Sequence, residues 1–183
     1  MRDSLEKACE KICECYRAGG KVLVCGNGGS AADSGHIAGD LVKGFLKKRP
    51  LPEKWQKELG MPLQLGLPAI DLTAQSAVIS ATANDLGGDY VYAQQVMAYA
   101  EENDVLIGIS TSGNAANVIN AARVAHVKGA AVIALTGEGG GRLAEYCDIL
   151  LNVPERETYR VQEKHLELYH RLCARVEAEF FAE

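Results

Sequence analysis

The sequence lacks the features that mark membrane, secreted and nucleic-acid-binding proteins. It has no apolar run near the roughly 18 residues of a membrane-spanning helix, and residues 1–11 (MRDSLEKACEK) lack the apolar core of a signal peptide. The formal net charge is -5, whereas a general nucleic-acid binder presents a basic face. We therefore expect a cytoplasmic protein with neither a membrane partner nor a nucleic-acid partner.

Paired cysteines are also missing. The six cysteines include no CxxC pair, although Cys9 and Cys13 stand at a helical spacing that a zinc site could use. No second pair of ligands follows them, so we prefer free, buried thiols in a reducing compartment over a zinc site.

Nucleotide-binding signatures are incomplete. No GxxxxGK[ST] loop occurs, and the stretch from Gly26 to Ala31 has only part of a dinucleotide-binding fingerprint. That fingerprint needs an acidic residue about 20 positions further on to hold the ribose, and Asp71 comes far too late. We expect no organic cofactor.

The apolar pattern that is present alternates between strands and helices. Short apolar runs predict buried parallel strands at residues 21–25, 68–72, 104–109, 131–135 and 148–152. Helical periodicity predicts helices at residues 3–17, 30–47, 74–83, 88–100, 114–127 and 158–180. The length of 183 residues, 48% of them hydrophobic, suits one domain. The alternation predicts a doubly wound α/β fold, a three-layer αβα arrangement of the Rossmann-like or flavodoxin-like kind.

Residues 49–68 (RPLPEKWQKELGMPLQLGLP) interrupt this alternation. They hold four of the five prolines, and proline disfavours helix interiors and central strands. We expect an insertion that leaves the core and carries a short helix at residues 53–59.

Three predicted strands run into loops rich in glycine or hydroxyl side chains, and open α/β sheets bind ligands at these strand ends. The loops are 26–30 (GNGGS), 110–114 (STSGN) and 136–141 (TGEGGG). Glycine lets the backbone approach a ligand, while hydroxyls and helix N-terminal amides donate hydrogen bonds to anions. Together the loops indicate a phosphate-bearing ligand.

Histidines and a carboxylate lie close behind the first loop and in the last predicted helix. His36 and Asp40 share one helical face by their spacing, and Gln162 and His170 lie two turns apart on one side of the C-terminal helix. For His126 and His165 we expect packing or solvent contact only. Periodicity alone does not bring residues 36 and 170 together.

Five segments, GNGGSAADSGHIAGDL, TANDLG, ISTSGNAANVI, ALTGEGGG and VQEKHLELYH, occur in this order. They resemble those of the phosphoheptose isomerases in the sugar isomerase (SIS) superfamily, and the resemblance extends from about residue 18 to residue 180. It implies that residues 1–183 form a single SIS domain with a five-stranded parallel sheet flanked by helices. It also implies conversion of sedoheptulose 7-phosphate to glycero-manno-heptose 7-phosphate by a homotetramer whose pockets are completed by neighbouring subunits.

The resemblance assigns roles to individual residues. The phosphate-binding positions are Ser110, Thr111 and Ser112. The sugar-binding positions are Asn27, Gly28, Gly29, Ser30, Asp40, Asn84, Asp85 and Gln162. The zinc-binding positions are His36, Asp40, Gln162 and His170, of which Asp40 and His170 also match the acid/base pair. Such an isomerase removes a proton beside a carbonyl and shifts protons between oxygens, and zinc would polarise those oxygens.

The chain departs from the family at several positions. Asp40 and Gly39 stand where the family has glutamates, and Ala115 replaces a common phosphate-contacting serine. The insertion at 49–68 is longer than usual, and residues 157–160 replace the usual run before Gln162. Two alternatives therefore stay open: an isomerase of another sugar phosphate, and a non-catalytic SIS module like the relatives that associate with the replication initiator. The retained His36, Asp40, Gln162 and His170 favour an enzyme.

Overall fold

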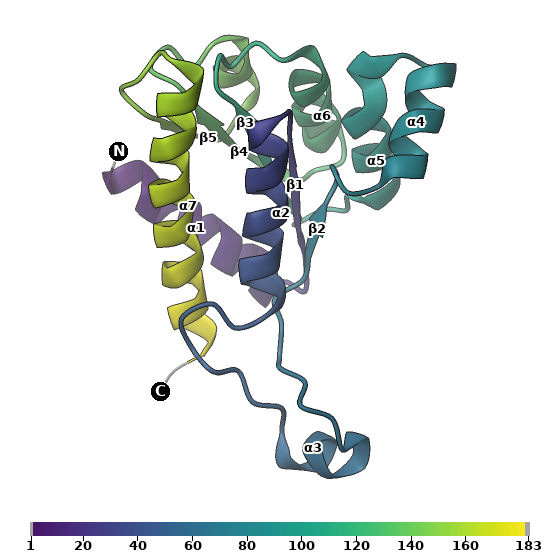
Figure 1. Cartoon of the computed structure of the whole chain (residues 1–183), viewed down its shortest axis with the longest axis vertical. Coiled ribbons are helices and arrows are strands. Elements are labelled where there is room, and N and C mark those ends of the chain that lie inside the picture. Colours follow the sequence, from purple (N-terminus) through teal and green to yellow (C-terminus); the bar gives the residue numbers. More distant parts are fainter. Residues whose placement is uncertain (1, 182–183) are drawn as a thin grey trace.

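Five short apolar strands form one all-parallel sheet in the computed structural model, which describes residues 2–181 (Figure 1). The strands are β1 (Val22–Gly26), β2 (Ala69–Asp71), β3 (Val105–Ser110), β4 (Ala131–Thr136) and β5 (Ile149–Asn152). Their order across the sheet is β2-β1-β3-β4-β5, the flavodoxin-like order of a doubly wound fold. The predicted fold class is therefore confirmed.

Helices cover both faces of the sheet. They are α1 (Arg2–Arg17), α2 (Gly29–Val42), α4 (Ser76–Asp85), α5 (Val91–Tyr99), α6 (Ala116–Val127), α7 (Thr158–Phe180) and the short 3-10 helices η1 (Gly88–Tyr90) and η2 (Arg142–Tyr146). One face is covered by α1, α2 and α7, and the other by α5 and α6. Among the described residues, none of the helices combines the length and apolar character needed to cross a bilayer.

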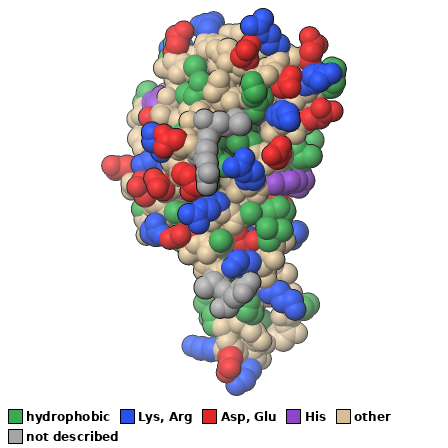
Figure 2. Space-filling view, turned by 90° about the vertical axis from the view of Figure 1, so that its left-hand side faces the viewer, with side chains coloured by type: hydrophobic (Ala, Val, Ile, Leu, Met, Phe, Trp, Pro, Cys, Tyr) green, Lys and Arg blue, Asp and Glu red, His purple; other side chains and the backbone are tan. Residues whose placement is uncertain are grey.

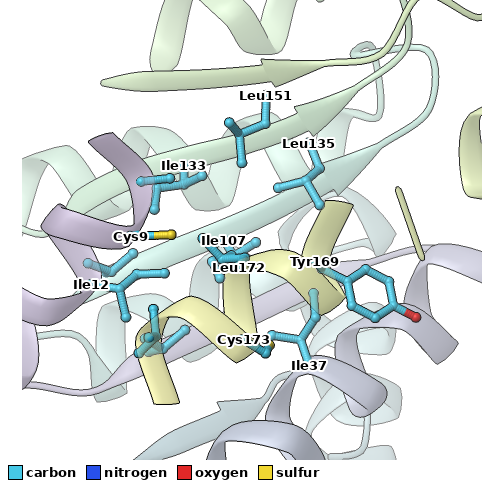
Figure 3. Packing of buried hydrophobic residues seen from close by; sticks show 14 of the residues in the cluster. Cys9, Ile12, Ile37, Ile107, Ile133, Leu135, Leu151, Tyr169, Leu172 and Cys173 are labelled. Atoms are coloured by element: carbon cyan, nitrogen blue, oxygen red, sulfur yellow. The ribbon is translucent and has the colours of Figure 1, made fainter. Parts of the chain in front are cut away.

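The alternation of side chains along the strands creates two hydrophobic cores. Val22 and Val24 of β1 point to the core under α1, α2 and α7, whereas Leu23 and Cys25 point to the core under α5 and α6. Figure 3 shows the first core, where helix and strand side chains interdigitate. All six cysteines are free thiols and all but Cys147 are buried, as expected.

Helix α2 ends at Val42, so the prediction of a helix to residue 47 was wrong. Lys43 takes an extended conformation, and the last carbonyl groups of the helix bond to a side chain instead of continuing the helix. The Arg49 guanidinium donates hydrogen bonds to the carbonyls of Asp40 (2.9 Å) and Leu41 (2.6 Å). Arg49 lies beyond the end of α2, so the helical periodicity of the sequence did not reveal where the helix stops.

Residues 43–68, called the extension below, project from the body and carry helix α3 (Glu53–Leu59) at their tip (Figure 1). The short helix within the proline-rich insertion is thus confirmed. The segments before and after α3 pair through an isolated antiparallel bridge between Pro50 and Gln64. Large apolar side chains on the extension remain exposed, and Figure 2 shows hydrophobic side chains beside charged ones at the narrow lower end of the molecule. The exposed apolar residues of the extension are Leu46, Trp55, Leu59, Met61 and Leu63.

Candidate active site

The loops that follow β1 and β3 meet at the point where the strand order reverses. After β1 the chain moves to β2 on one side, and β3 then adds on the other side of β1. Ligands of open α/β sheets bind at this switch point. Asn27 in the first loop and Asn117 at the start of α6 exchange two side-chain hydrogen bonds of 2.9 Å across it. The fold therefore joins the two predicted ligand loops.

The glycine loop after β1 needs its glycines. Gly28 has φ +57°, a left-handed conformation that favours glycine. A Cβ atom on Gly29 would lie 2.5 Å from the side-chain nitrogen of Gln162, so the amide of Gln162 lies directly against the first turn of α2. Asn27, Gly28 and Gly29 are exposed, whereas Ser30 is buried. The loop thus presents open backbone beside a polar side chain from α7.

The hydroxyl loop after β3 is held from behind by the loop after β4. The amide of Gly137 donates to the carbonyl of Thr111 (2.9 Å), and the amide of Leu143 donates to that of Gly113 (2.8 Å). Ser110 is buried at the end of β3, while Ser112 is exposed and its hydroxyl accepts a hydrogen bond from the amide of Asn114. We conclude that the TGEGGG loop supports the hydroxyl loop.

A cluster of three ionisable side chains forms between α2 and α7. The Nε2 atoms of His36 and His170 are 3.3 Å apart, and His36 Nε2 is 3.8 Å from Asp40 Oδ2. One donor atom from each residue lies within 4.8 Å of the others. Helices α2 and α7 lie side by side in Figure 1 and run in the same direction, which brings residues 36 and 170 together.

Asp40 is the least solvated member of this cluster. Its side chain is buried, and Oδ2 has no hydrogen-bond partner among residues 2–181. Burial raises the pKa of the Asp40 carboxyl, while the positive charges of His36 and His170 oppose that rise. A buried carboxylate oxygen without a donor, facing two imidazoles, fits a bound cation such as zinc.

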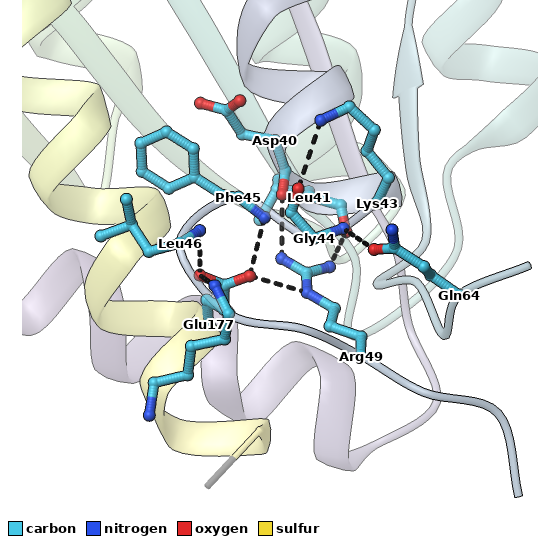
Figure 4. A network of polar contacts seen from close by, with 10 residues as sticks. Asp40, Leu41, Lys43, Gly44, Phe45, Leu46, Arg49, Gln64 and Glu177 are labelled. Carbon is cyan, nitrogen blue, oxygen red and sulfur yellow. Dashed lines mark hydrogen bonds and ion pairs between the residues drawn. The ribbon is translucent and has the colours of Figure 1, made fainter. Parts of the chain in front are cut away.

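A buried ion pair holds the end of α2 where Asp40 lies (Figure 4). Arg49 Nε donates to Glu177 Oε1 at 2.9 Å, and both side chains are fully buried. The Glu177 carboxylate also accepts hydrogen bonds from the amides of Phe45, Leu46 and Lys47. This network places the Phe45 ring 5.5 Å from the His170 ring, so it shapes one wall of the cluster.

Other candidates lie elsewhere. Asn84 and Asp85 are exposed at the end of α4, where the Asn84 amide donates to the Asp85 carboxylate (2.7 Å). The ring nitrogens of His126 and His165 bond to the backbone carbonyls of Tyr146 and Thr136. These contacts fit the expectation that His126 and His165 have structural roles only. Burial raises the pKa of the Cys9 thiol to about 12.

Sequence reasoning missed four residues around the cluster. Asp33 lies three residues before His36, so its place on the same helical face was available from spacing. Tyr169 carried no such signal because its position fits the buried apolar side of α7, as a core residue would. Arg49 and Glu177 had none either, since a pairing between the insertion and the last helix follows only from the fold.

The comparisons with known proteins agree over nearly the whole chain. The SIS domain family matches residues 1–57 and 62–137. The phosphoheptose isomerase of Rhodospirillum rubrum is 41% identical over 198 residues, which cover 97% of each chain. That of Aliarcobacter butzleri is 43% identical over 179 residues, covering 98% of this chain and 87% of the relative.

Solved structures give the same result. The phosphoheptose isomerase from Neisseria gonorrhoeae has a TM-score of 0.82 at 40% identity, covering 96% of this chain and 86% of that chain. The one from Francisella tularensis has a TM-score of 0.83 at 35% identity, covering 95% and 85%. By sequence, by fold and by extent of coverage, the chain belongs to the SIS domain family and, within it, to the phosphoheptose isomerases, a group of sugar-phosphate isomerases.

Proposed function

We propose that the protein interconverts sedoheptulose 7-phosphate and glycero-manno-heptose 7-phosphate by acid/base proton transfer. The observation that carries this proposal is the position of the His36–Asp40–His170 cluster, two of whose members lie on α2, the helix that begins at the glycine loop. His36 lies seven residues after Gly29, which is roughly 10 Å along the helix axis. A sugar anchored by its phosphate at the switch point can therefore extend toward the ionisable groups.

Each part of the pocket takes one task. Ser110, Thr111 and Ser112 bind the phosphate with hydroxyl and amide donors. The sugar hydroxyls contact Asn27, Gly28, Gly29, Ser30 and Gln162, together with Asn84 and Asp85. Asp40 removes the proton beside the carbonyl, and its raised pKa makes it a stronger base than an exposed aspartate. His170 donates and accepts protons at the sugar oxygens.

Zinc fits the donor set of the cluster. His36, Asp40 and His170 would hold the ion through two imidazoles and a carboxylate, with the Gln162 amide as a fourth ligand. When bound, zinc supplies Lewis acidity toward the substrate oxygens. Asp40 is one methylene shorter than glutamate, so we expect weaker metal binding than a glutamate would give.

Phosphate binding should depend on the hydroxyl loop. Each hydrogen bond to a charged group is worth about 1.5–3 kcal/mol. Replacing Ser110 and Ser112 together by alanine should weaken sugar-phosphate binding well over tenfold, as measured by calorimetry. Ser80→Ala on exposed α4 is the matched control and should leave affinity unchanged. Unchanged affinity in the double variant would place the phosphate in another loop.

We further propose a homotetramer. The apolar sides of α1 and α7 pack against the sheet within one chain, so these helices do not themselves need a partner subunit. Assembly is supported by the exposed apolar side chains of the extension, which a partner subunit would bury. It is also supported by Asn84 and Asp85, which are proposed to bind the sugar but are exposed in a single chain. Light scattering should give the mass of a tetramer at micromolar concentration. A stable monomer would contradict the proposal.

A second candidate is an isomerase of a different sugar phosphate. Asp40 and the long extension favour it, because the shorter carboxylate changes the cluster itself and the extension places the Phe45 ring 5.5 Å from that of His170. A screen of aldose and ketose phosphates, with and without added zinc, tests both candidates. We expect the highest turnover with the seven-carbon substrate. Failure of every sugar phosphate to turn over or to shift the melting temperature would reject the enzyme.

A further inference from the structure

We propose that Tyr169 is a positioning residue that fixes the tautomer of the His36 imidazole through a chain of hydrogen bonds from Asp33. The proposal deepens the function above, in which His36 contributes to the metal and proton-transfer site. Neither the sequence motifs nor the spacing of the cluster assigned a role to Tyr169 or Asp33.

The chain of polar atoms is short and continuous. The Tyr169 hydroxyl lies 3.2 Å from Asp33 Oδ1 and 3.0 Å from His36 Nδ1. On the other side of the ring, His36 Nε2 faces His170 Nε2 at 3.3 Å and Asp40 Oδ2 at 3.8 Å. Asp33 and His36 therefore meet at the same tyrosine oxygen.

The number of available hydrogens decides which atom donates and which accepts in each of these hydrogen bonds. A tyrosine hydroxyl has one hydrogen, and an ionised carboxylate only accepts hydrogen bonds. Tyr169 therefore donates to Asp33, and its oxygen accepts the hydrogen on His36 Nδ1. A neutral imidazole with its hydrogen on Nδ1 has a lone pair on Nε2. That lone pair points at Asp40 and His170, where a metal ligand needs it.

Packing keeps the tyrosine in place. Tyr169 is only 1% exposed, and Figure 3 shows its ring at the edge of the hydrophobic core with the hydroxyl directed away from it. Its ring meets the His36 ring edge-to-face, with centroids 5.3 Å apart. The side chain is therefore fixed by the core, and the half-exposed His36 takes its orientation from it.

The decisive experiment reads the tautomer directly, by nitrogen-15 NMR of the histidines in metal-free, substrate-free protein above the pH at which the imidazoles titrate. We expect the hydrogen of His36 on Nδ1. His126 and His165 are internal references, because each Nε2 bonds to a backbone carbonyl and must carry the hydrogen. Tyr169→Phe should turn His36 into a tautomer mixture and leave both references unchanged.

Asp33→Ala provides a variant with the opposite effect. Without the carboxylate, the tyrosine hydrogen is free to turn to His36 Nδ1, so the His36 hydrogen should move to Nε2. A residue that only fills space would cause no such inversion. Hydrogen on Nε2 in the unaltered protein, or the same tautomer in all three proteins, would overturn the proposal.

Zinc titration of the same proteins tests the consequence. Loss of a partner that orients a ligating histidine weakens metal binding about 10–100-fold, and we expect this range for Tyr169→Phe. Tyr159→Phe, which removes an exposed hydroxyl from the same helix, should bind zinc as the unaltered protein does. Equal zinc affinities in the unaltered protein, Tyr169→Phe and Tyr159→Phe would overturn the positioning role. The tautomers remain informative even if the unaltered protein binds no zinc and the proposed metal site fails.

Discussion

Asp40→Asn should lower the turnover number of the isomerase by about 10²–10⁴-fold, the usual contribution of general acid–base catalysis. The asparagine amide has nearly the same shape as the carboxylate but cannot accept a proton from carbon. The proposed phosphate-binding residues, Ser110 to Ser112, follow β3 and lie outside α2, so the affinity for a sugar phosphate should change little. Steady-state kinetics together with calorimetry on the inactive variant separate the two effects.

The pH dependence of the unaltered enzyme should carry the same signature. Asp40 acts as a base only when ionised, so activity falls as the pH drops through its pKa. Because burial raises that pKa above the ordinary 3.8, the loss should begin at a higher pH than for an exposed aspartate.

Asp40→Glu is the matched control, since it keeps the carboxylate and adds the methylene that the family pattern has. We expect it to retain zinc or bind it more tightly. Full activity in Asp40→Asn would remove this residue from the mechanism. His170 would then be the candidate base, with the exposed Glu163 as an alternative.

Glu177→Gln should cost about 3–5 kcal/mol of unfolding free energy, because it leaves the buried Arg49 without its counter-ion. The glutamine also provides one acceptor oxygen where the carboxylate used two for the amides of residues 45–47. Chemical denaturation measures the loss. Glu179 lies on the same helix as Glu177 and forms an exposed ion pair with Arg17 of α1. Glu179→Gln is the control and should leave the midpoint unchanged.

The acid sensitivity of stability should change in the same variant. Burial works to raise the pKa of Glu177, but the amides of Phe45 and Leu46 and the charge of Arg49 prevail and lower it. A carboxyl group with a depressed pKa stabilises the fold at pH values above its ordinary pKa of 4.5. This stabilisation is lost as the pH falls through the pKa of the folded state. The glutamine variant should lack this part of the acid dependence. An identical pH profile in both proteins would show that the Glu177 charge adds nothing.

The sheet and the loop positions were predictable because they depend on local pattern. Wholly apolar runs such as residues 21–25 indicate buried parallel strands. The glycines after the first strand indicated a loop with unusual backbone angles, and Gly28 does adopt φ +57°. The spacing of His36 and Asp40 likewise placed them on one helical face.

What escaped prediction depends on contacts between distant segments. The stop of α2 at Val42 is set by Arg49, whose position is fixed in turn by Glu177, 128 residues further along the chain. The meeting of His36 with His170 required the packing of α2 against α7. No periodicity within either helix contains that information.

The most direct test of the account is isomerisation of sedoheptulose 7-phosphate in D₂O, followed by NMR. Proton transfer through Asp40 delivers a solvent-derived hydrogen to the carbon that gains one, because the neighbouring His36 is open to water. We predict deuterium at C2 of the aldose product, and with Asp40→Asn we predict that product formation and exchange slow together by about 10²–10⁴-fold. Product that forms without deuterium, or equal exchange in the two proteins, would contradict acid/base catalysis at this site.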